Sequence, residues 1–61
     1  MKPVCPGDLL CDIDAGKVYM VILGGLHEMS VDRKCNVLPM QEAVGLTRLE
    51  EDGEPVTEAD I

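Results

Sequence analysis

One stretch of the sequence decides the fold: Lys17-Val18-Tyr19-Met20-Val21-Ile22-Leu23, followed by Gly24-Gly25. It is the longest apolar run of the chain, and it contains the only aromatic residue. Because successive side chains of a β-strand point to opposite faces, this strand would be apolar on both sides. Such a pattern is typical of a strand that is covered on both faces. We therefore expect this stretch to be the central strand of a small β-domain.

The segment before the central strand predicts a β-hairpin. Pro6-Gly7-Asp8 is a turn signal, and the partial alternation from Asp8 to Ile13 predicts a strand. The short reversal at 14–16 would join this strand to the central one. We place Leu9, Cys11 and Ile13 on the core face of the first strand. Asp8, Leu10 and Asp12 would then face outward.

The segments after Gly25 show weaker patterns. Residues 26–31 and 35–38 predict two short strands, separated by a polar turn at 32–34 and ended by Pro39. Residues 39–49 fit either a helix, with Pro39 at its first position, or a strand. Gly45 would cost a helix about 1 kcal/mol relative to alanine. We favour one helical turn at 39–43, followed by a closing strand at 44–49.

Four to five short strands with glycine and proline at the corners predict a mostly β fold, a small SH3-like or OB-like barrel. The Pro6-Gly7-Asp8 entry, followed by a hairpin at Gly16-Lys17-Val18-Tyr19, resembles many SH3-like barrels. Such barrels host unrelated functions, so this resemblance of architecture implies no particular activity. We expect a barrel domain over residues 1–49 and a flexible acidic tail over residues 50–61.

The net charge of −7 is spread unevenly. Residues 50–61 contain six acids and no base, so the rest of the chain is close to neutral. A charged segment with Gly53 and Pro55 is typical of a solvated, disordered end. The five bases form no run longer than two, so direct binding of nucleic acid is not expected. An alternative for the tail is an acidic decoy that occupies the basic surface of a nucleic-acid-binding protein.

The cysteines and the apolar runs indicate the cellular setting. Three cysteines are an odd number, and Met1-Lys2 leads into Pro3 and not into an apolar leader. The central apolar run is far too short to span a bilayer. We therefore expect a cytoplasmic chain with free thiols and no membrane association.

No group of residues indicates catalysis or a bound cofactor, so we do not expect an enzyme. His27 and Ser30 would point to opposite faces of one strand, and nothing in the sequence places Cys35 beside His27. A zinc site is the one metal alternative, because three cysteines and a histidine can hold zinc tetrahedrally. However, five residues separate the first two cysteines, whereas zinc knuckles use closer pairs. The set would be Cys5, Cys11, His27 and Cys35.

The size of the chain favours a function in binding. A 61-residue domain without Trp or Phe has a small core and marginal stability, so a partner is expected. Methionine, which occurs four times, is common on adaptable binding surfaces. We expect a non-enzymatic protein-binding module, an accessory or inhibitory factor of the kind that phages and mobile elements encode. The alternative is a self-associating structural subunit of a larger assembly.

The expected contact surface is an apolar face of the barrel. It comprises Leu10, Tyr19, Val21, Leu23, Gly24, Gly25 and His27. We assign Tyr19, Val21 and Leu23 to the outward side of the central strand, where they need a cover. Either residues 40–49 fold back over this side, or a partner protein covers it.

Overall fold

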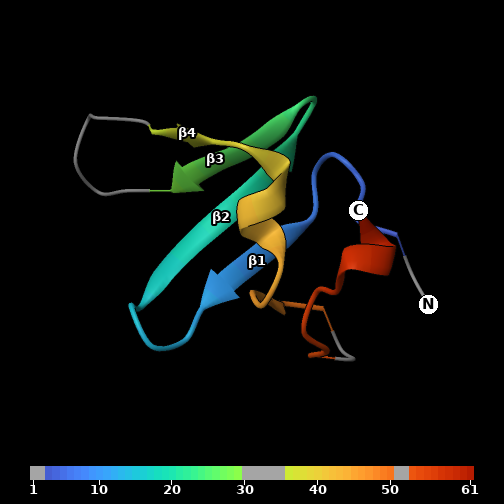
Figure 1. The fold of residues 1–61 in the computed structure, drawn as a ribbon. Coiled ribbons are helices and arrows are strands. Elements are labelled where there is room, and N and C mark those ends of the chain that lie inside the picture. The colour runs from blue at the N-terminus through green and yellow to red at the C-terminus, as the bar shows by residue number, and fades with distance from the viewer. Residues whose placement is uncertain (1–2, 30–35, 51–52) are drawn as a thin grey trace.

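The computed structural model describes residues 3–29, 36–50 and 53–61. Within them the chain forms one antiparallel sheet of five strands in the order β4-β3-β2-β1-β5 (Figure 1). The strands are β1 (Leu9–Asp12), β2 (Lys17–Ile22), β3 (Gly25–Met29), β4 (Val37–Leu38) and β5 (Thr47–Arg48). Two 3₁₀ turns, η1 (Met40–Ala43) and η2 (Glu58–Asp60), complete the fold. The prediction of a mostly β domain is thus confirmed.

The strand β2 lies in the middle of the sheet, as its two-sided apolar pattern predicts. It pairs with β1 through Leu10 opposite Tyr19, and with β3 through Val21 opposite Leu26. The turns of both hairpins contain a glycine with positive φ, 67° at Gly16 and 84° at Gly24. Only glycine adopts this conformation without steric cost. The predicted hairpin between the first two strands is therefore present, and a second hairpin follows it.

The sheet does not close into a barrel. The strands β4 and β5 are its two edges, and no ladder joins them within the described residues. The last part of the predicted third strand, the polar turn at 32–34 and Cys35 lie outside these residues.

Residues 39–49 form one helical turn followed by a short strand, as we predicted. Pro39 precedes η1 with an extended backbone, and Gly45 takes a φ of 93° where the chain turns toward β5. The strand β5 then pairs with β1, so that Arg48 lies opposite Leu10. This return places η1 over one face of the sheet, in front of β2 in Figure 1.

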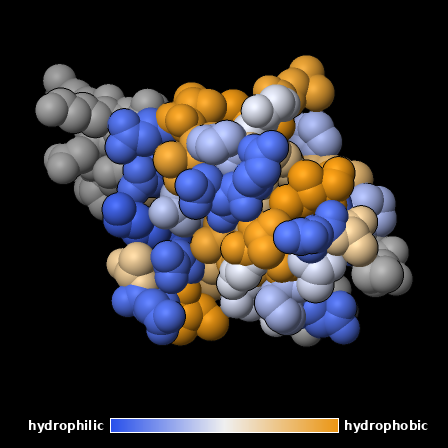
Figure 2. Space-filling model, viewed as in Figure 1, coloured by the Kyte–Doolittle hydropathy of each residue, from blue (hydrophilic) through white to orange (hydrophobic). Residues whose placement is uncertain are grey.

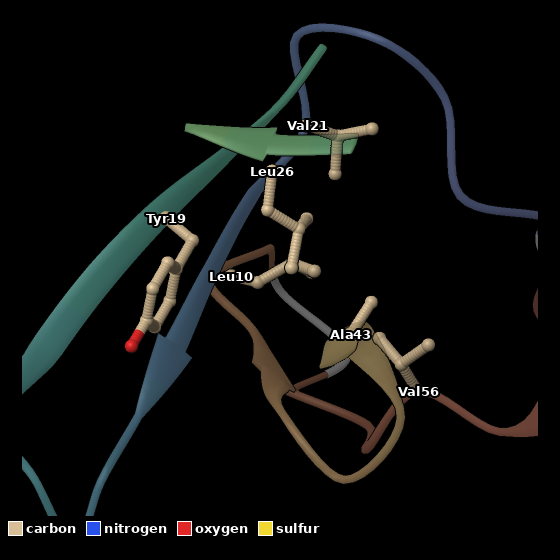
Figure 3. Close-up of a cluster of buried hydrophobic side chains, with 6 residues drawn as sticks. All are labelled: Leu10, Tyr19, Val21, Leu26, Ala43 and Val56. Atoms are coloured by element: carbon tan, nitrogen blue, oxygen red, sulfur yellow. The ribbon is translucent and has the colours of Figure 1, made fainter. Parts of the chain in front are cut away.

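The core lies between that face of the sheet and the segments folded over it. Figure 3 shows Leu10 and Leu26 meeting in the middle of the core, with Ala43 and Val56 side by side on one flank. The chain itself therefore covers the side of β2 that bears Tyr19, through η1 and through Val56. The buried apolar residues are Leu10, Tyr19, Val21, Leu26, Ala43 and Val56.

The predicted orientation of the first strand is wrong. Leu10 is fully buried, whereas Leu9 is 40% exposed and Ile13, which lies beyond the end of β1, is 73% exposed. The two aspartates beside Leu10 do not prevent its burial, because both carboxylates lie at the ends of the strand. There they accept backbone hydrogen bonds in turns: Asp8 from Cys5 (2.9 Å) and Asp12 from Ala15 (3.2 Å).

The prediction of a flexible tail is wrong for residues 53–61. The backbone of Val56 donates to Leu46 (2.8 Å) and accepts from Gly45 (3.0 Å), and Thr47 forms a bridge with Pro55. This pairing extends the sheet beyond β5 and inserts the Val56 side chain into the core. Residues 51 and 52 lie outside the described residues.

A buried ion pair fastens the end of the tail. The Asp60 carboxylate accepts hydrogen bonds from the backbone and hydroxyl of Thr57 (2.9 and 3.0 Å), and Arg48 Nη2 lies 3.5 Å from Asp60 Oδ2. The Asp60 carbonyl also accepts from the backbone of Val4 (3.0 Å). The Thr57 backbone bond is the main cause of a lowered pKa of the Asp60 carboxyl, and the Arg48 charge adds to it.

Two adjacent leucines provide a matched test of which face is the core. We expect Leu10→Ala to reduce the free energy of unfolding by about 2–5 kcal/mol, because it leaves a cavity in the core. Leu9→Ala removes the same atoms from the exposed side and should change stability by less than about 1 kcal/mol. Urea unfolding followed by circular dichroism measures both. An equal loss in the two variants would contradict the assignment.

The Asp60 interactions should make stability depend on acid pH. Because the folded protein lowers the pKa of Asp60, the carboxylate stabilises the fold above its ordinary titration range, and this contribution is lost as the pH falls from about 5 to 3. Asp60→Asn should be less stable at pH 7, where it leaves Arg48 without the carboxylate, and its stability should fall less steeply in acid. Thermal melts between pH 7 and pH 3 measure how the melting temperature of the wild type and of the variant depends on pH. Parallel curves for the two proteins would exclude this role of Asp60.

Candidate functional site

The side of the sheet opposite the core forms a second apolar surface. Since Leu10, Tyr19 and Leu26 point into the core, their strand neighbours point to the other side. The register sets these neighbours in rows, with Leu9, Met20, His27 and Val37 forming one row across four strands. Leu49 extends this row, because its backbone donates to Leu9 (3.0 Å). We call this surface the outer face: Leu9, Cys11, Val18, Met20, Ile22, Gly25, His27, Met29, Val37, Thr47 and Leu49.

The outer face contains no charged side chain, counting His27 as neutral. Its margins are open to solvent, with Met29 48% and Val37 62% exposed. Towards the centre of the sheet, Val18, Met20 and Ile22 are half-buried by their neighbours. Among the described residues, η1 and Val56 pack on the core side, so they do not cover this surface.

The predicted contact residues do not form one surface. Leu10, Tyr19 and Val21 are part of the core, where η1 and the tail cover them. Leu23 and Gly24 are exposed in the turn between β2 and β3. Of the predicted set, Gly25 and His27 belong to the outer face.

Gly25 has a structural role in the sheet. It is buried, and a Cβ atom at this position would collide with the backbone carbonyl oxygen of Leu38. The absence of a side chain therefore allows β4 to approach β3 closely at this end of the sheet.

A shallow pocket of about 210 Å³ lies at one corner of the outer face, lined by Gly7, Leu9, Leu49 and Glu50. Small-molecule sites have volumes of about 300–1,000 Å³. The pocket is thus better suited to a single inserted side chain than to a substrate. Glu50 places a carboxylate at this margin of the outer face.

The charged side chains of the described residues lie outside the outer face, with Glu50 at its margin. Nine of the twelve acids and two of the five bases belong to the described residues, which therefore account for a net charge of −7 by themselves. Both of these bases are ion-paired, Arg48 with Asp60 and Lys17 with Glu28 (3.3 Å). On the side where η1 lies, hydrophilic and hydrophobic residues are interspersed (Figure 2).

The Lys17–Glu28 pair lies on the core side of the sheet. Asn36 Nδ2 also donates to Glu28 (3.1 Å), and this bond is the main cause of a lowered pKa of the Glu28 carboxyl, followed by Lys17. In return, the hydrogen bond to Glu28 raises the pKa of Lys17. Both groups are thereby held in their charged forms on the side away from the outer face.

The residues considered for zinc binding are only partly described. Cys5 is exposed in the segment before β1, whereas Cys11 and His27 lie on the outer face in strands separated by β2. Cys35, the fourth member, lies outside the described residues. Within residues 3–29, 36–50 and 53–61, no group of three or more His, Cys, Asp or Glu residues could hold a metal ion.

Two further findings bear on the function. No helix within the described ranges is long and apolar enough to cross a membrane. Comparison of the chain with protein-family models, curated proteins and solved structures found no match. A functional assignment therefore depends on the geometry and chemistry of the outer face.

Proposed function

We propose that this chain is a non-enzymatic protein-binding module, an accessory or inhibitory factor, and that the outer face is its contact surface. The single observation that supports this proposal is a surface that is contiguous across five strands and free of charged side chains, formed by the residues of the outer face other than the buried Gly25. Soluble proteins rarely expose contiguous apolar patches larger than a few hundred Å², and larger patches mark interaction sites.

The composition of the outer face suits a protein partner. Removal of apolar area from water provides roughly 25 cal/mol per Å², without directional requirements. Met20 and Met29 lie in the neighbouring strands β2 and β3, and their flexible thioether side chains adapt to partners of different shape. The pocket beside Leu9 offers a place for one anchoring side chain of the partner.

We also propose that the architecture is that of an SH3-like barrel. Two features support this description. The strands that come first and last in the chain, β1 and β5, pair with each other, and the 3₁₀ turn η1 precedes β5. The bridge between Thr47 and Pro55 continues the pairing beyond β5. The apolar outer face is then the outside of an incompletely closed barrel.

Introduction of a negative charge on the outer face should weaken binding without unfolding the protein. We expect Leu9→Glu and Met29→Glu each to lose at least tenfold in affinity, because a carboxylate would be buried without a partner. Both positions are 40–48% exposed, so the isolated domain tolerates the charge. The measurement compares the proteins that the immobilised wild type and variants retain from a lysate of the native host, followed by titration of the retained protein.

Leu23→Glu is the matched control. Leu23 is 88% exposed in the turn outside the sheet, so the same change there adds the same charge away from the outer face. Circular dichroism and urea unfolding verify that all three variants fold. If Leu9→Glu and Met29→Glu bind the retained protein as tightly as Leu23→Glu does, the outer face is not the contact surface.

A second candidate function is an acidic decoy for a nucleic-acid-binding protein. The observation that favours it is the net charge of −7 within the described residues, of which the two bases are both ion-paired. A basic partner would bind on the charged side of the molecule, where Glu54 and Glu58 are exposed on the tail.

The decoy function predicts strong dependence on salt. We expect the double variant Glu54→Gln/Glu58→Gln, which keeps the backbone contacts of the tail, to weaken binding several-fold at low salt, and high salt to abolish it. Deletion of the tail is unsuitable as a test, because it would remove Val56 and Asp60 from the fold. Binding that is unaffected by salt and by both glutamates would exclude the decoy.

A further inference from the structure

We propose that the partner of the outer face is a second copy of this chain, so that two sheets stack face to face. This inference rests on the proposed function of the outer face and names its occupant. Four features of the described residues support it: the location of the charge, the separation of like charges, the area of the face and the need of the sheet for a second layer.

The location of the charge favours a partner without charge. A basic protein would gain electrostatic energy on the side of the acids, whereas the outer face offers it no carboxylate except Glu50 at the margin. A lipid surface is disfavoured for the same reason, because a chain with a net charge of −7 is repelled by anionic membranes. An uncharged apolar face is complementary to another one, and a second copy supplies it.

Face-to-face stacking also keeps like charges apart. Sheets pack about 10 Å from each other, and Asp12 and Glu28 belong to the core side of their strands by the register. The acids of η1 and η2 lie farther still from the contact, because η1 and the tail pack over the core side. Salt of physiological strength screens charges beyond about 8 Å. Apart from Glu50 at the margin of the outer face, these acids lie away from the contact, so their repulsion between two copies is weak.

The area of the face is sufficient for a weak dimer. Strands about 4.8 Å apart, with a rise of about 3.3 Å per residue, give the outer face a flat projection on the order of 400 Å². With the relief of the side chains, two copies would bury roughly 1,000 Å², the lower end of specific interfaces. We therefore expect dissociation constants in the micromolar to millimolar range.

The sheet itself needs a second layer. A sheet that is apolar on both sides is stable when each side packs against another layer. The chain supplies one layer with η1 and Val56. A second copy would supply the other and would turn two single sheets into a sandwich with the aligned packing that is common for β-sheets.

The native cysteines provide a direct test. Cys11 lies on the outer face between Val18 and Thr47, whereas Cys5 is exposed outside the sheet. As the concentration of the reduced protein rises from micromolar to millimolar, alkylation of Cys11 should slow several-fold, and that of Cys5 should not change. Mass spectrometry of the digested protein resolves the two sites. Sedimentation equilibrium should show a dimer over the same range, and added salt should not weaken it.

The outer-face variants complete the experiment. Leu9→Glu and Met29→Glu should remain monomeric at all concentrations, and Leu23→Glu should dimerise as the wild type does. A wild-type protein that stays monomeric with an unchanged Cys11 rate, or an oligomer that survives Leu9→Glu, overturns the inference. A different result excludes the proposed function: in the lysate experiment, Leu9→Glu and Met29→Glu retain a different protein as well as the wild type does.

Discussion

The structure depends on one constraint: β2 is apolar on both faces, and the described part of the chain covers one of them. Tyr19 and Val21 pack under η1 and the tail, which makes their side of the sheet the core. Val18, Met20 and Ile22 have cross-strand neighbours but no layer above them among the described residues. The side that η1 and the tail cover is the core, and the other side is the outer face.

The C-terminal residues belong to the fold because that single layer includes them. Val56 completes the core, and Asp60 joins β5, through Arg48, to the segment before β1, through Val4. Burial of an ion pair adds little net stability, because both charges lose their hydration. Its effect here is to fix position, because Arg48 Nη2 reaches the Asp60 carboxylate (3.5 Å) when the tail lies along β5. Part of the acidity at the C-terminus is therefore structural.

Short-range signals in the sequence were sufficient for the strands and turns, but not for their orientation. The hairpin around Gly16 and the helical turn after Pro39 depend on neighbouring residues, and both were predicted. When a strand is apolar on both sides, alternation does not tell which side faces the core. Leu9 and Leu10 are an example, because each places a leucine on a different face. The pattern therefore assigns Leu9, Cys11 and Ile13 to the core and Leu10, which is the buried residue, to the outer side. The same error, an assignment of the wrong side of the strand to the core, affects the predicted contact residues. Of these, only Gly25 and His27 lie on the outer face.

The order of the tail was missed because it depends on contacts between distant residues. Val56 is one apolar residue within an acidic segment, and its burial requires Ala43 and Leu10 to be in place. A local signal was nevertheless present, because Thr57-Glu58-Ala59-Asp60 has the spacing of a capping box, which η2 forms. A capping box beside an apolar residue argues for a docked end even where the surrounding composition predicts disorder.

The apolar character of the outer face is not required by the fold. An antiparallel sheet with one side in water normally alternates apolar and polar residues, and threonine, tyrosine or charged side chains would serve its solvent side. Val18 and Val37 are favoured in strands in any case, but Leu9, Met20 and Met29 are not among the strongest strand formers. Their exposure adds nothing to the core and lowers solubility. The contact that we propose would explain these residues, whereas the stability of the single chain does not.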